Sequence, residues 1–191
     1  MDATITRARR AAVAVAVAIA CLASAAYAQP LPDHQQRQTF RMNLGGPSGT
    51  YTDWEMGGLQ GFHELRATID VSKVHGKPRD TWAALARLAL VGPGEADERG
   101  QCSLLLIHDR KDKTRRVVFE HADERIGLDF GLPPEGKVEF GLKRVAPGEL
   151  RIEHGDQYSD VPCPIEIVGA RALGSGVDVS FDPLTVTSNA P

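Results

Sequence analysis

The sequence has few cysteines, few aromatic residues and none of the compact motifs that support metal or nucleophilic chemistry. Phe, Trp and Tyr make up 6% of the 191 residues, and there are three cysteines. No C-x-x-C, H-x-x-x-H or H-E-x-x-H spacing occurs, and there is no G-x-S-x-G nucleophile turn. The sequence therefore predicts no catalytic residue, no metal site and no cofactor.

The sequence also has no excess of positive charge. Lys and Arg number 22 against 25 Asp and Glu, for a net charge of −3. Nucleic-acid binding needs a basic face that neutralises phosphates, so this class of partner is excluded. Basic residues are concentrated only in "RKDKTRR", residues 110–116. We interpret this stretch as a solvated hairpin tip; contact with an anionic surface, such as lipopolysaccharide or an acidic glycan, is the alternative.

Long apolar runs are absent except at the N-terminus. Three arginines among the first ten residues precede "AAVAVAVAIACLASAA", and small residues stand at Ala26 and Ala28. This pattern is typical of a signal peptide spanning 1–28, cleaved after Ala28. The apolar run is shorter than the ~20 residues of a spanning helix, which argues against an uncleaved anchor. Lipidation at Cys21 is the second alternative, because small residues precede that cysteine as in a lipobox.

Cleavage would leave 29–191 as a single domain without a membrane span, exported to the periplasm or the exterior. It would remove three arginines and one aspartate, so the net charge would change from −3 to −5. It would also leave two cysteines, Cys102 and Cys163, and an even count in an exported chain predicts one disulfide. Closing a loop of about 60 residues stabilises a fold by roughly 4 kcal/mol.

Strand periodicity dominates the rest of the chain. Apolar residues alternate with polar ones in 40–44, 65–71, 126–132 and 138–142, and glycine- or proline-containing turns separate many of these segments. Short strands at this spacing predict an all-β protein, an antiparallel β-sandwich or barrel.

The segment "TWAALARLALV", residues 81–91, is ambiguous, because Ala, Leu and Arg favour helices. We interpret it as a strand, since the chain around it is β and it ends in a Gly-Pro-Gly turn. One face of that strand would hold Trp82, Ala84, Ala86, Leu88 and Leu90. As a helix, its apolar stripe would be Trp82, Leu85, Leu88 and Ala89.

Residues 102–121 predict a hairpin, with "CSLLLIH" and "RRVVFEH" flanking the tip "DRKDKT". If the tip is symmetric, we expect Ile107 to lie near Val117 and Ser103 near His121. Both faces of such a hairpin would be apolar, which is typical of strands covered on two sides.

Near the C-terminus, "GVDVSFDPLTV" changes the parity of its apolar residues. Val179 and Phe181 share one parity, whereas Leu184 and Val186 share the other. A bulge at Asp182-Pro183 would restore the inward direction of the second half. Proline cannot donate to a β ladder, which also favours an irregularity at this point.

The C-terminal part resembles the concanavalin A-like (laminin G-like) jelly rolls. The resemblance rests on "VEFGLKRVAPGELRIEHGD" and "IEIVGARALGSGVDVSFDPLTV". The matching positions are Gly148, Leu150, Ile152, Gly155, Gly176, Val179, Phe181, Asp182, Leu184 and Val186. It implies two curved antiparallel sheets and a range of activities from lectin-like binding to glycan cleavage. The N-terminal half has no family motif, so no functional residue is transferred.

Candidate ligand-binding residues are aromatic. Tyr51, Asp53 and Trp54 in "GTYTDWEMGG", and Tyr158 in "GDQYSD", occur near glycine-containing turns. Sugar sites stack a ring on an exposed aromatic side chain and bind hydroxyls with nearby carboxylates. For Trp54, a place in the core is the alternative interpretation.

An acidic stretch offers a second set of candidates. Glu120, Glu124 and Asp129 in "FEHADERIGLD" are candidate glycosidase acids, or residues of a solvated turn. The leading hypothesis is a non-catalytic exported β-sandwich that binds glycan or another envelope component. The alternatives are a glycoside-cleaving enzyme and a structural or interaction subunit without a small ligand.

Overall fold

The computed structural model describes residues 34–77, 80, 82–94 and 100–190. The predicted signal peptide 1–28, with Cys21, Ala26 and Ala28, lies outside the described residues. Every strand belongs to the compact unit Gln35–Pro191. Among the described residues, no helix has the length and apolarity needed to cross a membrane.

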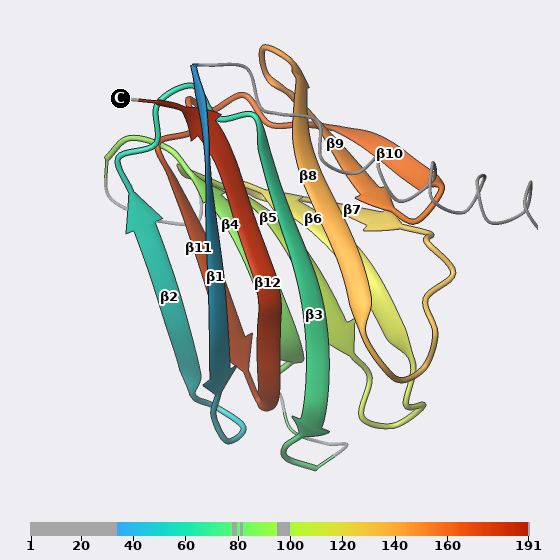
Figure 1. The fold of residues 1–191 in the computed structure, drawn as a ribbon. Coiled ribbons are helices and arrows are strands. Elements are labelled where there is room, and N and C mark those ends of the chain that lie inside the picture. The colour runs from blue at the N-terminus through green and yellow to red at the C-terminus, as the bar shows by residue number, and fades with distance from the viewer. Residues whose placement is uncertain (1–33, 78–79, 81, 95–99, 191) are drawn as a thin grey trace, which may run out of the picture. The chain divides into compact units, whose positions relative to one another are not determined.

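Twelve described strands form two six-stranded antiparallel sheets (Figure 1). Sheet A has the order β1 (Gln35–Gly45), β12 (Val177–Asn189), β3 (Glu64–Val74), β8 (Val138–Ala146), β9 (Glu149–His154) and β10 (Gln157–Pro162). Sheet B has the order β2 (Tyr51–Gly57), β11 (Gly169–Ser175), β4 (Ala84–Val91), β5 (Gln101–His108), β6 (Arg115–His121) and β7 (Glu124–Leu128). The predicted fold class, an all-β antiparallel sandwich, is confirmed.

The core lies between the two sheets, and strand alternation fills it. In β3, Leu65, Ala67 and Ile69 are buried, whereas Arg66 is exposed. The largest fully buried side chains include Phe119, Phe140 and Phe181. Burial of one such phenylalanine contributes about 1.5–3 kcal/mol.

Residues 84–91 form β4, so the strand interpretation of the ambiguous segment is confirmed. The predicted inner face is correct for Ala84, Ala86, Leu88 and Leu90, each fully buried. It is wrong for Trp82, whose side chain is 62% exposed. The reason is that the strand begins only at Ala84, and Arg110 binds the Trp82 carbonyl oxygen through Nη1 at 2.5 Å.

The β5–β6 hairpin forms, but its register differs by one residue from the predicted one. Ile107 lies opposite Arg116 rather than Val117. A symmetric tip of the six residues 109–114 pairs His108 with Arg115 and Ile107 with Arg116, and a hydrogen bond from the Asp109 N–H to the Thr114 carbonyl oxygen closes it at 2.9 Å. The core face of the hairpin therefore consists of Leu104, Leu106, Val117 and Phe119.

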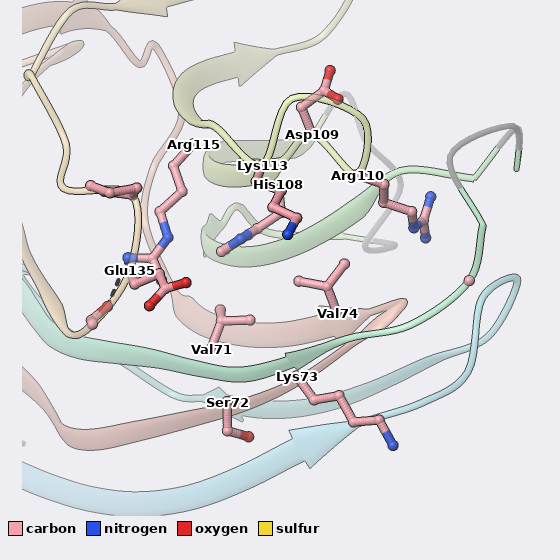
Figure 2. Close-up of a pocket in the computed structure, with 13 residues that line it drawn as sticks. Val71, Ser72, Lys73, Val74, His108, Asp109, Arg110, Lys113, Arg115 and Glu135 are labelled. Atoms are coloured by element: carbon pink, nitrogen blue, oxygen red, sulfur yellow. Dashed lines mark hydrogen bonds between the residues drawn. The ribbon is translucent and has the colours of Figure 1, made fainter.

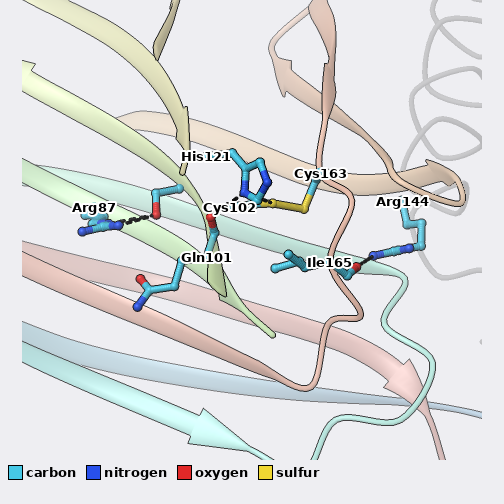
Figure 3. Close-up of a disulfide and its surroundings, with 8 residues drawn as sticks. Arg87, Gln101, Cys102, His121, Arg144, Cys163 and Ile165 are labelled. Atoms are coloured by element: carbon cyan, nitrogen blue, oxygen red, sulfur yellow. Dashed lines mark hydrogen bonds between the residues drawn. A yellow bond between two sulfur atoms is a disulfide. The ribbon is translucent and has the colours of Figure 1, made fainter. Parts of the chain in front are cut away.

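Cys102 and Cys163 form a disulfide that links the two sheets (Figure 3). Cys102 lies in β5 of sheet B, and Cys163 follows β10 of sheet A. Both residues are fully buried and are separated by 61 positions. His121 lies opposite Cys102 on β6, with its Nδ1 3.7 Å from the Cys102 sulfur. The bond thus joins the sheets from within the core.

The parity change in β12 is a bulge. Phe181 pairs with Ile69 of β3 and Leu184 with Ala67, so three steps along β12 match two along β3. Phe181 and Leu184 are both buried, whereas Asp182 between them is exposed. The predicted irregularity is therefore present, although β12 lies between β1 and β3 rather than at a sheet edge.

Candidate functional site

The candidate aromatic residues on β2 point to two different faces. Tyr51 is 63% exposed and shares the outer face with Asp53, whereas Trp54 points inward. The Trp54 ring packs against Phe40 of β1, with 4.6 Å between ring centroids, and contacts the core. Asp53 accepts hydrogen bonds from Arg171 of β11 at 2.9 and 2.5 Å. The Asp53 carboxylate is therefore already engaged by a cation.

Tyr158 lies far from the other three candidates. It belongs to β10, at one edge of sheet A, whereas Phe40, the partner of Trp54, belongs to β1 at the opposite edge. Five strand spacings separate these edges, a distance of roughly 24 Å. The structure therefore does not bring Tyr158 together with the candidates on β2.

Tyr158 does line a cavity of about 480 Å³. The cavity lies between the two edge strands β7 and β10, and its walls are residues 126–130 and 156–159. Asp129 comes from the first segment and Asp156 from the second. Gln157 and Ser159 add polar groups that both donate and accept hydrogen bonds. An exposed aromatic ring, two carboxylates and neutral polar groups thus share one surface depression.

The Tyr158 ring is held in place by a cation. The Arg151 guanidinium carbon lies 4.1 Å from the centre of the ring, and the ring remains 61% exposed. Arg151 itself donates to both carboxylate oxygens of Asp160, at 2.8 and 2.9 Å. This hydrogen bonding lowers the pKa of Asp160 and raises the pKa of Arg151, so both groups stay charged at neutral pH. The aromatic surface is therefore preorganised.

A second cavity, of about 570 Å³, lies at the end of the sandwich where the β5–β6 hairpin turns (Figure 2). Its walls are the end of β3, the hairpin tip and the turn 134–136. Of the basic stretch 110–116, Arg110, Lys113 and Arg115 line this cavity. The sequence identified the basic tip but gave no signal for the cavity beneath it.

The acidic candidates are dispersed. Glu120 is 8% exposed, accepts a hydrogen bond at 2.7 Å from Nε of Arg125 and forms an ion pair with Nη2 of the same residue at 2.7 Å. Glu124 lies at the start of β7, opposite His121, whereas Asp129 lines the cavity beside Tyr158. Within the described part of the chain, no group of three or more His, Cys, Asp or Glu side chains is placed to hold a metal ion.

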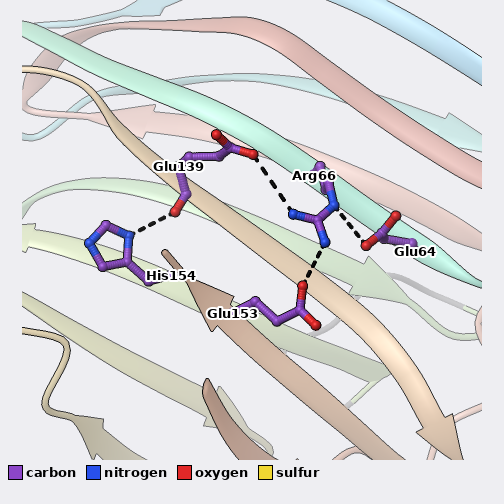
Figure 4. A network of polar contacts seen from close by, with 5 residues as sticks. All are labelled: Glu64, Arg66, Glu139, Glu153 and His154. Atoms are coloured by element: carbon purple, nitrogen blue, oxygen red, sulfur yellow. Dashed lines mark hydrogen bonds and ion pairs between the residues drawn. The ribbon is translucent and has the colours of Figure 1, made fainter. Parts of the chain in front are cut away.

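Another polar cluster lies on the outer face of sheet A, around Arg66 (Figure 4). Arg66 binds Glu64 at 2.8 Å and Glu153 at 2.6 Å, and Glu139 lies at 3.8 Å. His154 bonds through Nδ1 to the Glu139 carbonyl oxygen at 2.8 Å. Because one cation holds carboxylates from three strands, we assign this cluster a role in joining the strands of the sheet.

No family model matches the chain, and no curated protein matches it in sequence. Solved structures do resemble it. A fructosyltransferase from A. japonicus superposes with a TM-score of 0.50 at 8% identity, covering 82% of this chain and 26% of that one. Scytalido-glutamic peptidase with a peptide-based transition-state analogue gives 0.48 at 16% identity and 74% of each chain. Toad ovary galectin with thio-digalactose gives 0.48 at 12% identity, covering 70% and 97%.

These similarities define a class rather than a particular protein. At such low identity they concern the fold alone, and the two sheets described above establish it. The chain is an antiparallel β-sandwich of the kind expected from the concanavalin A-like resemblance. A fold of this kind does not define a function, so any function must come from the chain's own cavities.

Proposed function

We propose that the protein is an exported, non-catalytic β-sandwich that binds glycan in the cavity beside Tyr158. The observation that supports this proposal is the fixed and exposed Tyr158 ring in a depression that also contains Asp129 and Asp156. Pyranose rings combine an apolar face with a rim of hydroxyls, and this combination of side chains complements both parts.

The arrangement of Tyr158 favours stacking on one side of its ring. Arg151 covers one face, so the exposed surface comes mainly from the other face and the rim. The pair of hydrogen bonds between Arg151 and Asp160 restricts movement of the guanidinium and hence of the ring. A ligand then loses less side-chain entropy on binding than it would on a mobile tyrosine. The carboxylates accept hydrogen bonds from sugar hydroxyls, while Gln157 and Ser159 can donate or accept.

Export, cleavage after Ala28 and a periplasmic or extracellular location belong to the same proposal. The disulfide between Cys102 and Cys163 supports it, because such bonds persist in oxidising compartments. N-terminal sequencing and intact mass of the mature protein test it. A chain that begins at Gln29 agrees with the proposal, whereas a lipid-modified Cys21 contradicts cleavage at Ala28.

Binding is tested with an oligosaccharide and polysaccharide panel, read by calorimetry and thermal shift. Tyr158→Ala should weaken binding roughly tenfold, whereas Tyr158→Phe should retain most of it, because stacking uses the ring. Tyr51→Ala is the matched control, since Tyr51 is exposed to the same extent and lies on another strand. Equal losses for Tyr158→Ala and Tyr51→Ala, or no binding to any glycan, would contradict the proposal.

One observation favours the enzymatic alternative. Asp129, which follows β7, and Asp156, in the turn before β10, line the same cavity, and glycosidases use two carboxylates around one bond. Release of reducing ends from any bound oligosaccharide, abolished by Asp129→Asn, would establish glycoside cleavage. Binding without release would leave the non-catalytic proposal in place.

A further inference from the structure

The outer face of sheet B, which points away from the core, carries many apolar side chains. Leu105 is 6% exposed and Ala89 is 1% exposed, yet neither belongs to the core cluster between the sheets. Strand alternation places further half-buried apolar residues on the same face. The apolar residues of this face, on β4, β5, β6 and β11, are Leu85, Ala89, Leu105, Ile107, Val118 and Leu173.

The outer face of sheet A has the opposite character. On β3, its positions are Glu64, Arg66, Thr68 and Asp70. Every strand among the described residues belongs to one of the two sheets, so no third layer of strands covers sheet B (Figure 1). Contiguous apolar surface on the outside of a protein is typical of an interaction site. The difference between the two outer faces therefore assigns such a site to sheet B.

The charged side chains within the apolar face are engaged by their neighbours. Arg87, which lies between Leu105 and Leu173 in the strand register, donates to the Ser103 hydroxyl from Nε at 2.9 Å and from Nη2 at 2.7 Å. Arg171 forms an ion pair with Asp53 of β2. Charges that already have partners cost less to cover than isolated ones. A partner surface can therefore be placed over this face.

The strand pairings align the outer residues in rows that cross sheet B from β2 towards β7. The first row is Tyr51, Ser175, Leu85, Ile107 and Arg116. The second row is Asp53, Leu173, Arg87, Leu105, Val118 and Gly127. The third row is Glu55, Arg171, Ala89, Ser103, Glu120 and Arg125. The face thus has carboxylates along its β2 edge and arginines on β6 and β7.

We propose that two copies of the chain associate through the outer faces of sheet B. A two-fold axis that runs parallel to the strands, between β4 and β5, places β2 of one copy over β7 of the other, β11 over β6 and β4 over β5. Leu85 of one copy then lies over Ile107 of the other, in the first row. Leu173 likewise lies over Val118, in the second row. The apolar residues of the two copies therefore cover each other. This inference does not depend on glycan binding.

Charge favours this direction of the axis. Glu55 of one copy faces Arg125 of the other, and Arg171 faces Glu120, so each attraction occurs twice in the symmetric pair. An axis perpendicular to the strands would instead place β2 over β2, with Asp53 against the same residue of the second copy. That arrangement brings the two acidic edges together, which costs free energy.

The size of the face is sufficient for a reversible dimer. Five spacings between six strands give a width of roughly 24 Å, and the seven residues 85–91 span about 20 Å. Each copy therefore contributes roughly 500 Å², and the pair about 1,000 Å², which is close to the lower limit for a specific interface. Aligned sheets pack face to face about 10 Å apart in this way.

Sedimentation velocity at chain concentrations from about 1 to 200 μM tests the proposal, and the native chain should change from monomer to dimer across this range. Leu85→Glu and Ile107→Glu should each weaken the dimer at least about tenfold, because each buries two unpaired carboxylates in the interface. Val145→Glu is the matched control, since Val145 is a partly exposed apolar residue of β8 in sheet A. This variant should dimerise like the native chain, and thermal unfolding checks that all three variants are folded.

Glu55→Arg tests the direction of the axis in a variant that should fold normally, because Glu55 is exposed. The new arginine would face Arg125, so the dimer should be about fivefold weaker, and the loss should be smaller in high salt. A stronger dimer would indicate the perpendicular axis and overturn the proposed arrangement. A native chain that stays monomeric up to about 200 μM would overturn the dimer itself. Equal weakening by Val145→Glu and Leu85→Glu would also overturn it.

Discussion

The disulfide between Cys102 and Cys163 makes a quantitative prediction about stability. The bond closes a loop of 61 residues, and the chain-entropy model gives about 4 kcal/mol for a loop of this length at 25 °C. The stabilisation arises in the unfolded chain, whose freedom the bond restricts. Reduction should therefore lower the free energy of unfolding by that amount without altering the packing between the sheets.

Urea unfolding followed by tryptophan fluorescence measures this change. With an m value of about 2 kcal/mol/M, reductant should lower the urea midpoint by about 2 M. The double variant Cys102→Ala, Cys163→Ala should unfold near the reduced protein, and reductant should not change its midpoint. The variant loses some further stability because both cysteines are fully buried.

Two outcomes would refute this reasoning. If reductant shifts the midpoint of the native chain by less than about 0.5 M, loop closure does not contribute the expected free energy. If alkylation labels Cys102 and Cys163 equally with and without reductant, the bond is absent from the purified protein. Mass spectrometry of the alkylated chain distinguishes these two results.

Three further predictions concern single positions. Gly169→Ala would place a Cβ 2.7 Å from the Met56 carbonyl oxygen, so it should destabilise the fold by about 1–3 kcal/mol in thermal unfolding. Gly127→Ala is the control: its Cβ would have no atom within 4 Å, so it should cost less than about 1 kcal/mol. Arg66→Met leaves the carboxylates of Glu64, Glu139 and Glu153 without their shared cation, so it should lower the free energy of unfolding by about 1 kcal/mol at pH 7. The loss should be smaller in high salt, which screens the repulsion, and smallest near pH 3, where the carboxylates are protonated. Burial lowers the pKa of His108 from 6.5 to about 4, so between these pH values the unfolded chain binds a proton that the folded chain does not. The free energy of unfolding should therefore decrease as the pH is lowered from 6.5 to 4, by up to about 2 kcal/mol after allowance for partial exposure. His108→Gln should remove this part of the pH dependence in urea titrations at pH 7 and 4.5, and parallel curves for both proteins would contradict it.

The local features of the fold were predictable because they depend on residues close in sequence. Alternation in segments such as 65–71 identified strands, and the parity change at Asp182-Pro183 identified the bulge in β12. The sequence interpretation of β4 included Trp82 because alternation alone does not indicate where a strand begins. The hairpin register was missed by one residue, although the predicted six-residue tip, when symmetric, pairs Ile107 with Arg116 as observed.

The candidate sites were less predictable because they combine distant segments. Tyr158 was identified as an exposed aromatic residue, but Asp129, which lines the same cavity, follows a strand of the other sheet. The basic stretch at the hairpin tip was visible in the sequence, whereas Lys73 and Glu135 reach the same cavity only through the order of the strands. Non-local strand pairing of this kind leaves no pattern along one sequence.

The position of β12 has a consequence for how the protein is made. β12 is the last strand in the chain, yet it lies inside sheet A and pairs with β1 on one side and β3 on the other. Until β12 has been synthesised, β1 lacks the strand with which it pairs in the sheet. Sheet A can therefore be completed only after β12 is available, so β1 cannot join the sheet while the chain is still growing.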